Sequence, residues 1–395
     1  MMKMSVNHGT GVEELSYGSV SLDRSLKLLQ RCLKYSGLVD VFSGNSTRKC
    51  HTSRIVRYGF TFLALLLPFL IGGLSLIHLV IEMREGKTPT QLLPLVLQST
   101  LFFLTVLGLP VLPRRNQIYQ LMEDWKMMEM QLRCFNHSKI KLTTKIGYTY
   151  FFLFTILSAV AYFGLSEMDS GTFKNILVRY SFIRDIFNVH LLFLICAISS
   201  VYSFLWNVSL TEIVPIYFFY HVGCALENLD QEWKAHLKSE RFAQQIWDRY
   251  EGILRLVDRA NELFGLSVAI NDFMYFFLIW ITASLCITHY TENSSLVYCI
   301  LLFIFVFRVI FANVLLSKLH LSTEKLDRSI TGELSKKWHS FLQEDRDLLL
   351  SFLNALRSGN MAVRPLNLYV IRPHNLLSSL SVVVTYIIVV LQYKE

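Results

Sequence analysis

The chain contains 395 residues, of which 53% are hydrophobic and only 17% are charged, and its formal net charge is +8. Soluble globular domains carry about 25% charged residues, so this composition argues against a water-soluble protein and favours one that spans a membrane. The sequence shows no stripe of interleaved basic and aromatic residues, so the positive charge does not indicate nucleic-acid binding.

Seven apolar stretches are predicted to cross the membrane, because each approaches or exceeds the roughly 20 residues needed to span about 30 Å of hydrocarbon. Backbone amides inside a bilayer must be paired within the segment, so the spans are expected to be helices. The first four contain no Lys, Arg, Asp or Glu, the fifth contains Asp272 and the sixth contains Arg308. In chain order the predicted spans are 59–81, 92–112, 146–165, 186–210, 264–288, 296–315 and 376–391.

The basic residues predict which side of the membrane each connecting segment occupies, since positively charged loops stay in the cytoplasm. With the N-terminus inside, 31 of the 38 Lys and Arg residues lie in the inner segments and six lie in the outer ones. We therefore expect a cytoplasmic N-terminus, an extracellular C-terminus and an inner surface that contacts anionic membrane lipid. This orientation is opposite to that of G-protein-coupled receptors.

Amphipathic stretches outside the spans predict a cytoplasmic layer of helices. Leu26, Leu29 and Leu33 share one helical face, as expected for a helix that lies on the inner leaflet. Apolar residues at helical spacing continue beyond spans four to six, and a further stripe ends before Gly359, a typical helix stop. The predicted fold is all-α, and its parts are a cytoplasmic N-terminal segment 1–58, six spans with cytoplasmic extensions 59–326, a helical segment of this anchor layer 327–375, and the seventh span 376–395.

Two charged residues fall within the predicted spans, where an unpaired charge is costly. Asp272 and Arg308 are expected at similar depth in the fifth and sixth spans, and they are therefore candidates for an intramembrane ion pair. A structural pair is favoured over a gating element, because the inner ends of both helices are expected to face the cytoplasmic layer.

A ligand pocket in the outer halves of the spans would need polar and aromatic side chains. The candidates by depth are Gln98, Tyr162, Asn188, His190, Trp280, Tyr298 and Phe303. Each of them taken singly is more typical of helix packing, so the set defines a region rather than a site. Because carboxylates are scarce there, the region favours apolar or bitter-type small molecules over sugars.

The seven cysteines do not indicate a disulfide framework, because five of them lie in the expected cytoplasmic or membrane parts. Cys286 and Cys299 flank a short outer loop and could pair, although two free thiols are favoured. No motif for an enzyme, a nucleotide site or a metal site is present, so we expect no catalytic activity, no cofactor and no metal. A small-solute transporter is an alternative, but it would typically show repeated halves, and no internal repeat is seen.

The sequence ends on TYIIVVLQYKE, in which an apolar helix finishes close to the C-terminus. One face of this helix carries, at i, i+3, i+4 and i+7 spacing, the residues Thr385, Ile388, Val389 and Gln392. Taken alone, Gln392 could be an ordinary helix end at the lipid interface, with Tyr386 and Tyr393 as interfacial aromatic residues.

The order Thr385, Tyr386, five apolar residues, Gln392 and Tyr393 resembles the signature that closes insect gustatory receptors, where the last aromatic residue is usually Phe. The stretch RYEGILRLVDRANELFGLSVAINDF also resembles the region before the fifth span of that family. The resemblance implies a ligand-gated, non-selective cation channel in the plasma membrane of chemosensory neurons. Its implied partners are a small-molecule tastant, membrane lipid and related subunits in a homo- or heterotetramer. The related insect odorant receptors are the nearest alternative.

In that family the last helix lines a central pore. The resemblance therefore implies that the face of Thr385 points towards the channel axis, with rings of Ile388 and Val389 below a ring of Gln392 at the outer mouth. An apolar ring gates a pore by dewetting, and a ring of uncharged amides coordinates a partly hydrated cation without trapping it.

Overall fold

The computed structural model describes residues 73, 76–88, 92–93, 96–97, 99–100, 114–131, 145, 148–149, 152, 209–236, 242–288, 295–337, 339, 343–359 and 361–392. The secondary-structure elements among them are all helical, which confirms the predicted all-α class. In chain order they are α4 (Arg115–Gln131), the π-helical turn η2 (Ser209–Ile213), α9 (Val214–His236), α10 (Phe242–Thr288), α11 (Ser295–Lys337), α12 (Gln343–Arg357), the 3-10 helix η4 (Pro365–Asn367) and α13 (Pro373–Gln392).

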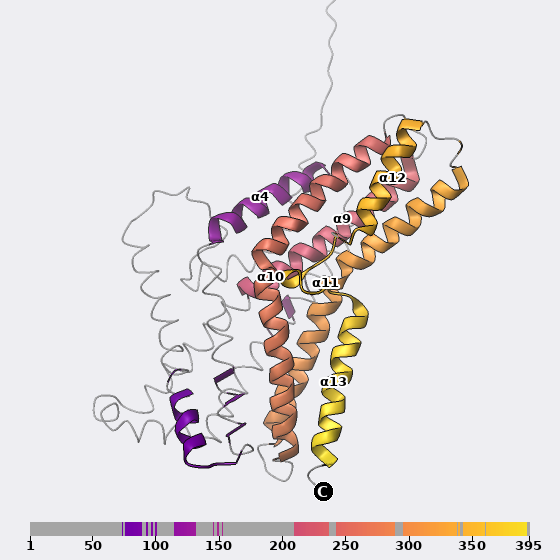
Figure 1. The fold of residues 1–395 in the computed structure, drawn as a ribbon. Helices are drawn as coiled ribbons and strands as arrows, with labels where there is room; N and C mark the ends of the chain where they lie inside the picture. Colours follow the sequence, from indigo (N-terminus) through magenta and orange to yellow (C-terminus); the bar gives the residue numbers. More distant parts are fainter. Residues whose placement is uncertain are drawn as a thin grey trace, which may run out of the picture.

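Two very long helices, α10 and α11, have 47 and 43 residues. At 1.5 Å per residue they are about 70 and 65 Å long, roughly twice the thickness of a bilayer core. Both contain stretches that are long and apolar enough to cross a membrane. Figure 1 shows them running from the lower part of the molecule, beside α13, into the upper part, beside α9 and α12. The predicted extension of spans five and six is therefore confirmed, and α11 continues to Lys337.

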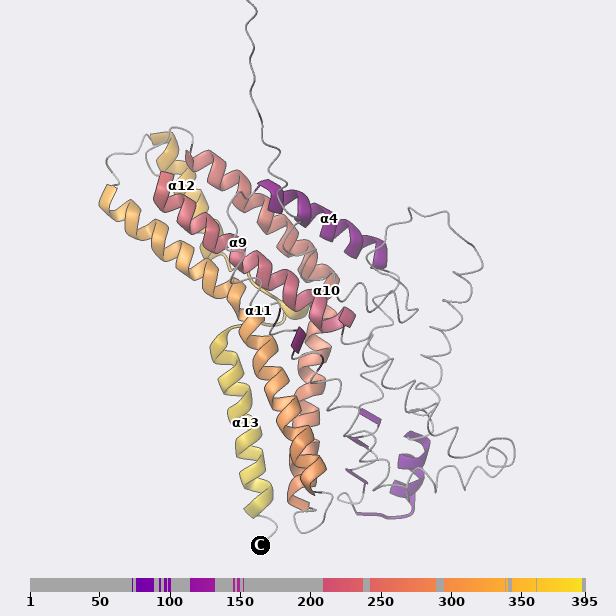
Figure 2. The same ribbon diagram turned by 180° about the vertical axis from the view of Figure 1, so that it is seen from behind.

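The upper part, which we call the anchor layer, consists of α4, α9, α12 and the adjoining halves of α10 and α11 (Figure 2). Gly223 allows α9 to approach α11 closely, because a Cβ atom there would lie 3.0 Å from Cγ of Lys318 and 3.1 Å from the backbone nitrogen of Leu319. The buried side chains of the layer form the anchor core, whose largest fully buried members are Trp125, Trp233, Tyr250, Phe218, Phe219, Phe264 and Phe352.

Helix α4 was not anticipated, because residues 113–145 were expected only as a cytoplasmic connection. Its buried face follows helical spacing, and Trp125 packs edge-on against Phe218 of α9, with 5.6 Å between ring centroids. On the exposed side, Arg259 of α10 donates hydrogen bonds to Asp124 and to Gln120, the second at 2.9 Å. Helix α4 therefore belongs to the anchor layer.

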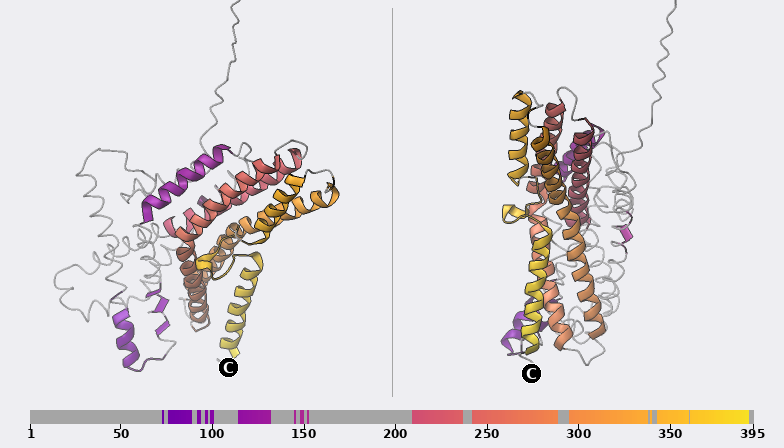
Figure 3. Two further views of the ribbon diagram at one scale, coloured as in Figure 1. Left: turned by 45° about the horizontal axis from the view of Figure 1, so that its top comes forward. Right: turned by 90° about the vertical axis from the view of Figure 1, so that its right-hand side faces the viewer.

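The lower part is built from the other halves of α10 and α11, with α13 alongside them (Figure 3). Leu376 and Val383 of α13 pack onto the buried side chains that α10 and α11 share. We call these buried side chains the outer cluster; they are Leu97, Tyr275, Leu278, Ile279, Ile281, Leu285, Tyr298, Leu301, Ile304, Phe305 and Val309.

The predicted ends of two helices can be compared directly with the structure. Gly359 has φ +73° just after α12, as expected for a helix stop, and α13 begins at Pro373, three residues before the predicted span. Pro at the first helical position is favourable, because its missing N–H would have no partner there. The amphipathic segment 1–58 and most of the first four predicted spans lie outside the described residues, and the membrane orientation stays a prediction.

Candidate pore helix and the polar pocket at its base

Helix α13 exposes a row of polar and apolar side chains that we call the α13 stripe. Its members fall within an arc of about 100° on a helix with about 100° per residue, and they are Ser378, Ser381, Thr385, Ile388, Val389 and Gln392. Ile388 is 49% exposed and Val389 is 38% exposed. Because Leu376 and Val383 pack on the opposite side, all four predicted pore residues face away from α10 and α11.

The hydroxyl groups of the α13 stripe have local partners. Thr385 Oγ1 donates to the Ser381 carbonyl at 2.8 Å, and Ser381 Oγ donates to the Ser378 carbonyl at 2.7 Å. Such bonds within a helix let a hydroxyl occupy an apolar environment without an unsatisfied donor. Tyr386 is part of α13, but its side chain and the whole of Tyr393 lie outside the described residues.

The segment Met361–Arg372, which we call the strap, connects α12 to α13 and is held by α10. Asn261 of α10 binds it twice, since its side-chain nitrogen donates to the Ala362 carbonyl and its side-chain oxygen accepts from the Arg364 backbone, both at 2.9 Å. The Arg364 guanidinium donates to Asp258 at 2.8 Å. Burial raises the pKa of Asp258 above its ordinary value, and the Arg364 charge opposes that rise.

Two positive φ angles bring the strap back onto α10. Leu366 has φ +52° and Asn367 has φ +58°, and the backbone nitrogen of Leu366 lies 3.2 Å from where a Cβ atom of Gly265 would stand. A left-handed conformation at a residue such as Leu costs about 1–2 kcal/mol. The strap therefore follows this path because its surrounding contacts require it, and not because Leu366 and Asn367 prefer positive φ angles.

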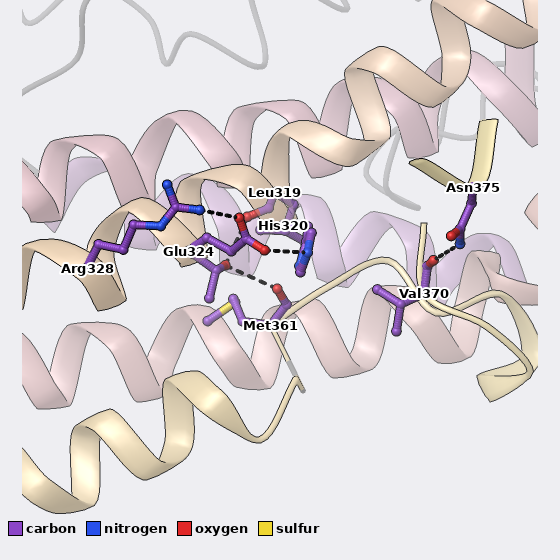
Figure 4. A network of polar contacts seen from close by, with 8 residues as sticks. Leu319, His320, Glu324, Arg328, Met361, Val370 and Asn375 are labelled. Atoms are coloured by element: carbon purple, nitrogen blue, oxygen red, sulfur yellow. Dashed lines mark hydrogen bonds and ion pairs between the residues drawn. The ribbon is translucent and has the colours of Figure 1, made fainter. Parts of the chain in front are cut away.

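On the other side the strap is held by α11. Thr323 Oγ1 donates to the Met361 carbonyl at 3.1 Å, and Asn375 closes the turn into α13 by donating to the Val370 carbonyl at 2.6 Å. Figure 4 shows these contacts near an ion-pair chain in which Glu324 lies between His320 and Arg328. Burial lowers the pKa of His320, the Glu324 carboxylate opposes this, and the Arg372 and His374 charges lower it further.

A small polar pocket lies where η2, α10 and α11 meet. Arg308 forms an ion pair with Glu212, and both side chains are almost completely buried. The Arg308 guanidinium also lies over the Tyr275 ring, with 3.6 Å to its centroid, a favourable cation–π geometry. Asn271 donates to the carbonyl and the hydroxyl of Thr211, at 3.2 and 3.1 Å.

The polar pocket is too small for an organic ligand. It encloses a cavity of about 20 Å³, which is room for about one water molecule, whereas ligand pockets usually measure about 300–1,000 Å³. Its location at the start of α9 and at the middle of α10 and α11 suggests a structural junction. The strap reaches it through Tyr369, whose hydroxyl donates to Asp272 at 2.7 Å.

The sequence-based partners Asp272 and Arg308 both line the polar pocket. Arg308 forms an ion pair with Glu212, and Asp272 accepts a hydrogen bond from Tyr369. The pairing of Asp272 with Arg308 stays a prediction. Burial and the Asp272 carboxylate raise the pKa of Tyr369 far above its ordinary value, so the phenol keeps its proton and remains a donor.

Three of the predicted ligand-pocket residues are described, and two of them are brought together. Tyr298 is 6% exposed and belongs to the outer cluster, against which Trp280 packs while also contacting Phe277. Phe303 is 68% exposed and stacks on Phe307 along the exposed side of α11. The other four candidates, Gln98, Tyr162, Asn188 and His190, lie outside the described residues.

Several residues that organise the base of α13 were not singled out from the sequence. These residues form hydrogen bonds between positions about 100 apart in the chain, and they are Tyr369, Arg364 and Asn261. The only local signal was the isolated acid Glu212 in an otherwise uncharged stretch. A buried charge of this kind needs a basic partner, which in this protein is Arg308.

The comparisons with known proteins agree with this architecture. The family model described as "7tm Chemosensory receptor" matches residues 26–395. A solved structure of the insect olfactory receptor OR5 from Machilis hrabei has a TM-score of 0.65 and 16% identity, and the match covers 93% of this chain and 100% of that chain. The structure of the same receptor in complex with eugenol has a TM-score of 0.64 and 15% identity, and the match covers 94% and 98% of the two chains. No curated protein sequence matches the chain.

The fold likeness confirms the predicted seven-transmembrane helical fold. The family match extends over nearly the whole chain and rests on sequence rather than on shape. The chain therefore belongs to the 7tm chemosensory receptor family.

Proposed function

We propose that the chain is a gustatory receptor subunit, a ligand-gated and non-selective cation channel whose pore is lined by α13. The observation that carries the proposal is the α13 stripe, in which hydroxyl, aliphatic and amide side chains share an exposed face. The hydroxyl groups of the stripe bond within the helix, but an amide such as that of Gln392 is unfavourable against lipid. If four copies are arranged around an axis in the plasma membrane of a chemosensory neuron, as a homo- or heterotetramer, the same stripe contacts water.

The order of side chains along the α13 stripe is suited to a gated pore. Ile388 and Val389 would form a hydrophobic constriction that excludes water when it narrows. Gln392, one turn closer to the C-terminus, would form a ring of uncharged amides that tolerates several cations. A neutral filter of this kind predicts weak selectivity among monovalent cations.

The agonist is proposed to be a small organic tastant, with apolar or bitter-type molecules favoured over sugars. Trp280 and Tyr298 contribute aromatic surface to the outer cluster. The Machilis hrabei olfactory receptor, which has the same fold, was solved in complex with eugenol, and this supports a small organic ligand for the present chain.

An odorant receptor subunit is the second candidate function. It is favoured by the fold likeness to the olfactory receptor OR5 of Machilis hrabei, whereas the ending from Thr385 to Gln392 favours a gustatory receptor. Responses of the expressed chain to a panel of non-volatile tastants and a panel of volatile odorants would distinguish the two functions.

The test of the proposed channel is patch-clamp recording from cells that express this chain, with the variant Gln392→Ala. We expect agonist-evoked cation currents whose relative permeabilities or unitary conductance change in the variant. Val384→Ala is the matched control, because Val384 is 54% exposed on α13 but lies outside the α13 stripe. Currents that change equally in both variants, or in neither, would place the pore elsewhere.

A further inference from the structure

The strap folds into a short loop whose ends are fixed and whose tip is exposed. The Ile371 backbone nitrogen donates to the Val363 carbonyl at 3.0 Å and so closes the loop. The exposed residues between these two ends, which we call the strap tip, are Leu366, Asn367, Leu368 and Tyr369. We propose that the strap tip binds anionic phospholipid of the inner leaflet, with acyl chains against its leucines and a headgroup at Arg372. This inference rests on the membrane-spanning fold and does not depend on the proposed channel function.

The contacts of the strap with α10 place the strap tip at the depth of the bilayer. Figure 1 shows the strap as the yellow connection between α12 and α13, where the lower part meets the anchor layer. Asn261, which binds the start of the strap, lies three residues before the predicted fifth span. Gly265 lies beside Leu366 inside that span, and Asp272, which accepts the hydrogen bond from Tyr369, lies eight residues inside it. These contacts extend over about 16 Å of α10, so the strap tip passes from the membrane boundary into the hydrocarbon.

The neighbouring surface of α10 is apolar as well. Leu266 and Phe273 are seven residues apart and therefore share one face of the helix. Both are exposed, and Phe273 stacks on Phe277, with 6.5 Å between the ring centroids. Tyr369 places a ring with a bonded hydroxyl at the membrane boundary, where tyrosine is enriched. Exposed apolar side chains on two adjoining elements form a surface that fits acyl chains better than water.

A basic residue follows the strap tip and complements an anionic headgroup. Arg372 and His374 flank Pro373, where α13 begins, and both are exposed. Arg364, near the other end of the loop, is already paired with Asp258, whereas Arg372 forms no ion pair with an acidic residue among those described. Anionic lipids of the cytoplasmic leaflet attract such an arginine. A second copy of this chain, whose net charge is +8, is a weaker electrostatic complement.

The first test identifies what contacts Leu368. This residue is replaced by benzoylphenylalanine in the full-length protein, which is reconstituted in vesicles of phosphatidylcholine and phosphatidylserine in equal amounts, illuminated and analysed by mass spectrometry. We expect a covalent phospholipid adduct. The same probe at Leu350, which is exposed on α12 in the anchor layer, is the matched control and should capture no phospholipid. A second receptor chain in place of phospholipid at position 368, no adduct there, or equal phospholipid capture at both positions overturns the proposal.

The second test measures the headgroup preference by titrating the purified protein in detergent with fluorescent phosphatidylserine and, separately, with fluorescent phosphatidylcholine. We expect tighter binding of phosphatidylserine. Arg372→Gln should weaken that binding about fivefold, because one arginine near a membrane surface contributes about this factor. Lys336→Gln is the matched control, since Lys336 is exposed on α11 but lies 13 residues, about 20 Å, beyond the strap contact at Thr323. Equal affinity of the wild type for both lipids, or an equal loss in both variants, contradicts the anionic headgroup site at Arg372.

Discussion

Tyr369 and Asp272 are joined by a hydrogen bond of 2.7 Å from the phenol to the carboxylate, although 97 positions separate them in the chain. Tyr369 belongs to the strap, four residues before α13 begins, and Asp272 belongs to α10. The contact therefore fixes the base of the candidate pore helix to the helix that extends into the anchor layer.

Replacing Tyr369 by Phe removes this bond and keeps the ring. A hydrogen bond to a charged group contributes about 1.5–3 kcal/mol, so we expect Tyr369→Phe to lower the free energy of unfolding by that amount. Thermal unfolding of the purified protein, followed by tryptophan fluorescence, measures the effect. Leu368→Ala is the control, because Leu368 is 75% exposed at the neighbouring position; an equal loss in both variants would contradict the assigned role of the hydroxyl.

The buried pair of Arg308 and Glu212 predicts a strong effect of removing one partner. Arg308→Met leaves the Glu212 carboxylate without its counter-charge, and breaking a buried pair in this way costs about 3–5 kcal/mol. The double variant Arg308→Met with Glu212→Leu is expected to recover much of the loss, because no unpaired charge remains. The yield of monodisperse protein and its melting temperature measure both variants.

An exposed ion pair on α10 provides the control for these variants of the Arg308–Glu212 pair. Arg255 and Glu251 of α10 are 2.6 Å apart, but their side chains are 75% and 42% exposed. Arg255→Met is expected to cost no more than about 0.5 kcal/mol. A similar cost for Arg255→Met and Arg308→Met would mean that the burial of the Glu212 pair has no energetic consequence.

The close approach of α9 and α11 predicts that Gly223 does not tolerate a larger residue. In Gly223→Val the added Cβ would lie about 3 Å from Lys318 and from the Leu319 backbone, and overpacking of this kind costs about 1–3 kcal/mol. Gly332→Val is the matched control on α11, since nothing lies within 4 Å of the added Cβ. We expect melting temperatures to fall for the first variant and to stay level or rise slightly for the second.

His221 predicts a loss of stability at acidic pH. It is fully buried among Tyr217 and Tyr220 of α9, and burial lowers its pKa from 6.5 to about 3. Between these two values the unfolded chain binds a proton that the folded protein does not. The free energy of unfolding therefore decreases as the pH falls, by at most about 1.4 kcal/mol per pH unit from this residue.

The measurement for His221 is denaturant unfolding at a series of pH values. The wild-type free energy of unfolding should fall by about 2 kcal/mol more between pH 6.5 and pH 5 than that of His221→Gln or His221→Phe. Parallel pH profiles of the three proteins would show that His221 does not cause the acid sensitivity.

The features that could be predicted from the sequence are those encoded by neighbouring residues. Helical periodicity and span length identified α10, α11, α12 and α13, and Gly359 marked a helix end because only a few residues decide such a stop. The shared helical face of Thr385 and Gln392 could also be predicted, since residues three, four and seven apart lie on one side of any helix, whereas the exposure of that face is known only from the structure.

The contacts at the base of α13 could not be predicted in the same way, because they depend on the relative rotation of helices. Arg308 pairs with Glu212, which lies beyond the end of the predicted fourth span, and the strap is held by Asn261, whose neighbours in the sequence give no sign of this contact. Helix α4 was missed because charged and amide residues interrupt its apolar residues and it is too short for a span, yet its buried residues Ile118, Leu121 and Trp125 show that a few well-placed side chains suffice for packing.

The unbroken course of α10 from Phe242 to Thr288 has a structural consequence. The helix bends where the lower part of the molecule meets the anchor layer (Figure 1), yet it continues as one element through that bend. Trp280 and Cys286 lie towards one end, and the strap is attached near the middle through Asn261 and Asp258. One continuous helix therefore links the outer cluster, the base of the candidate pore helix and the anchor core.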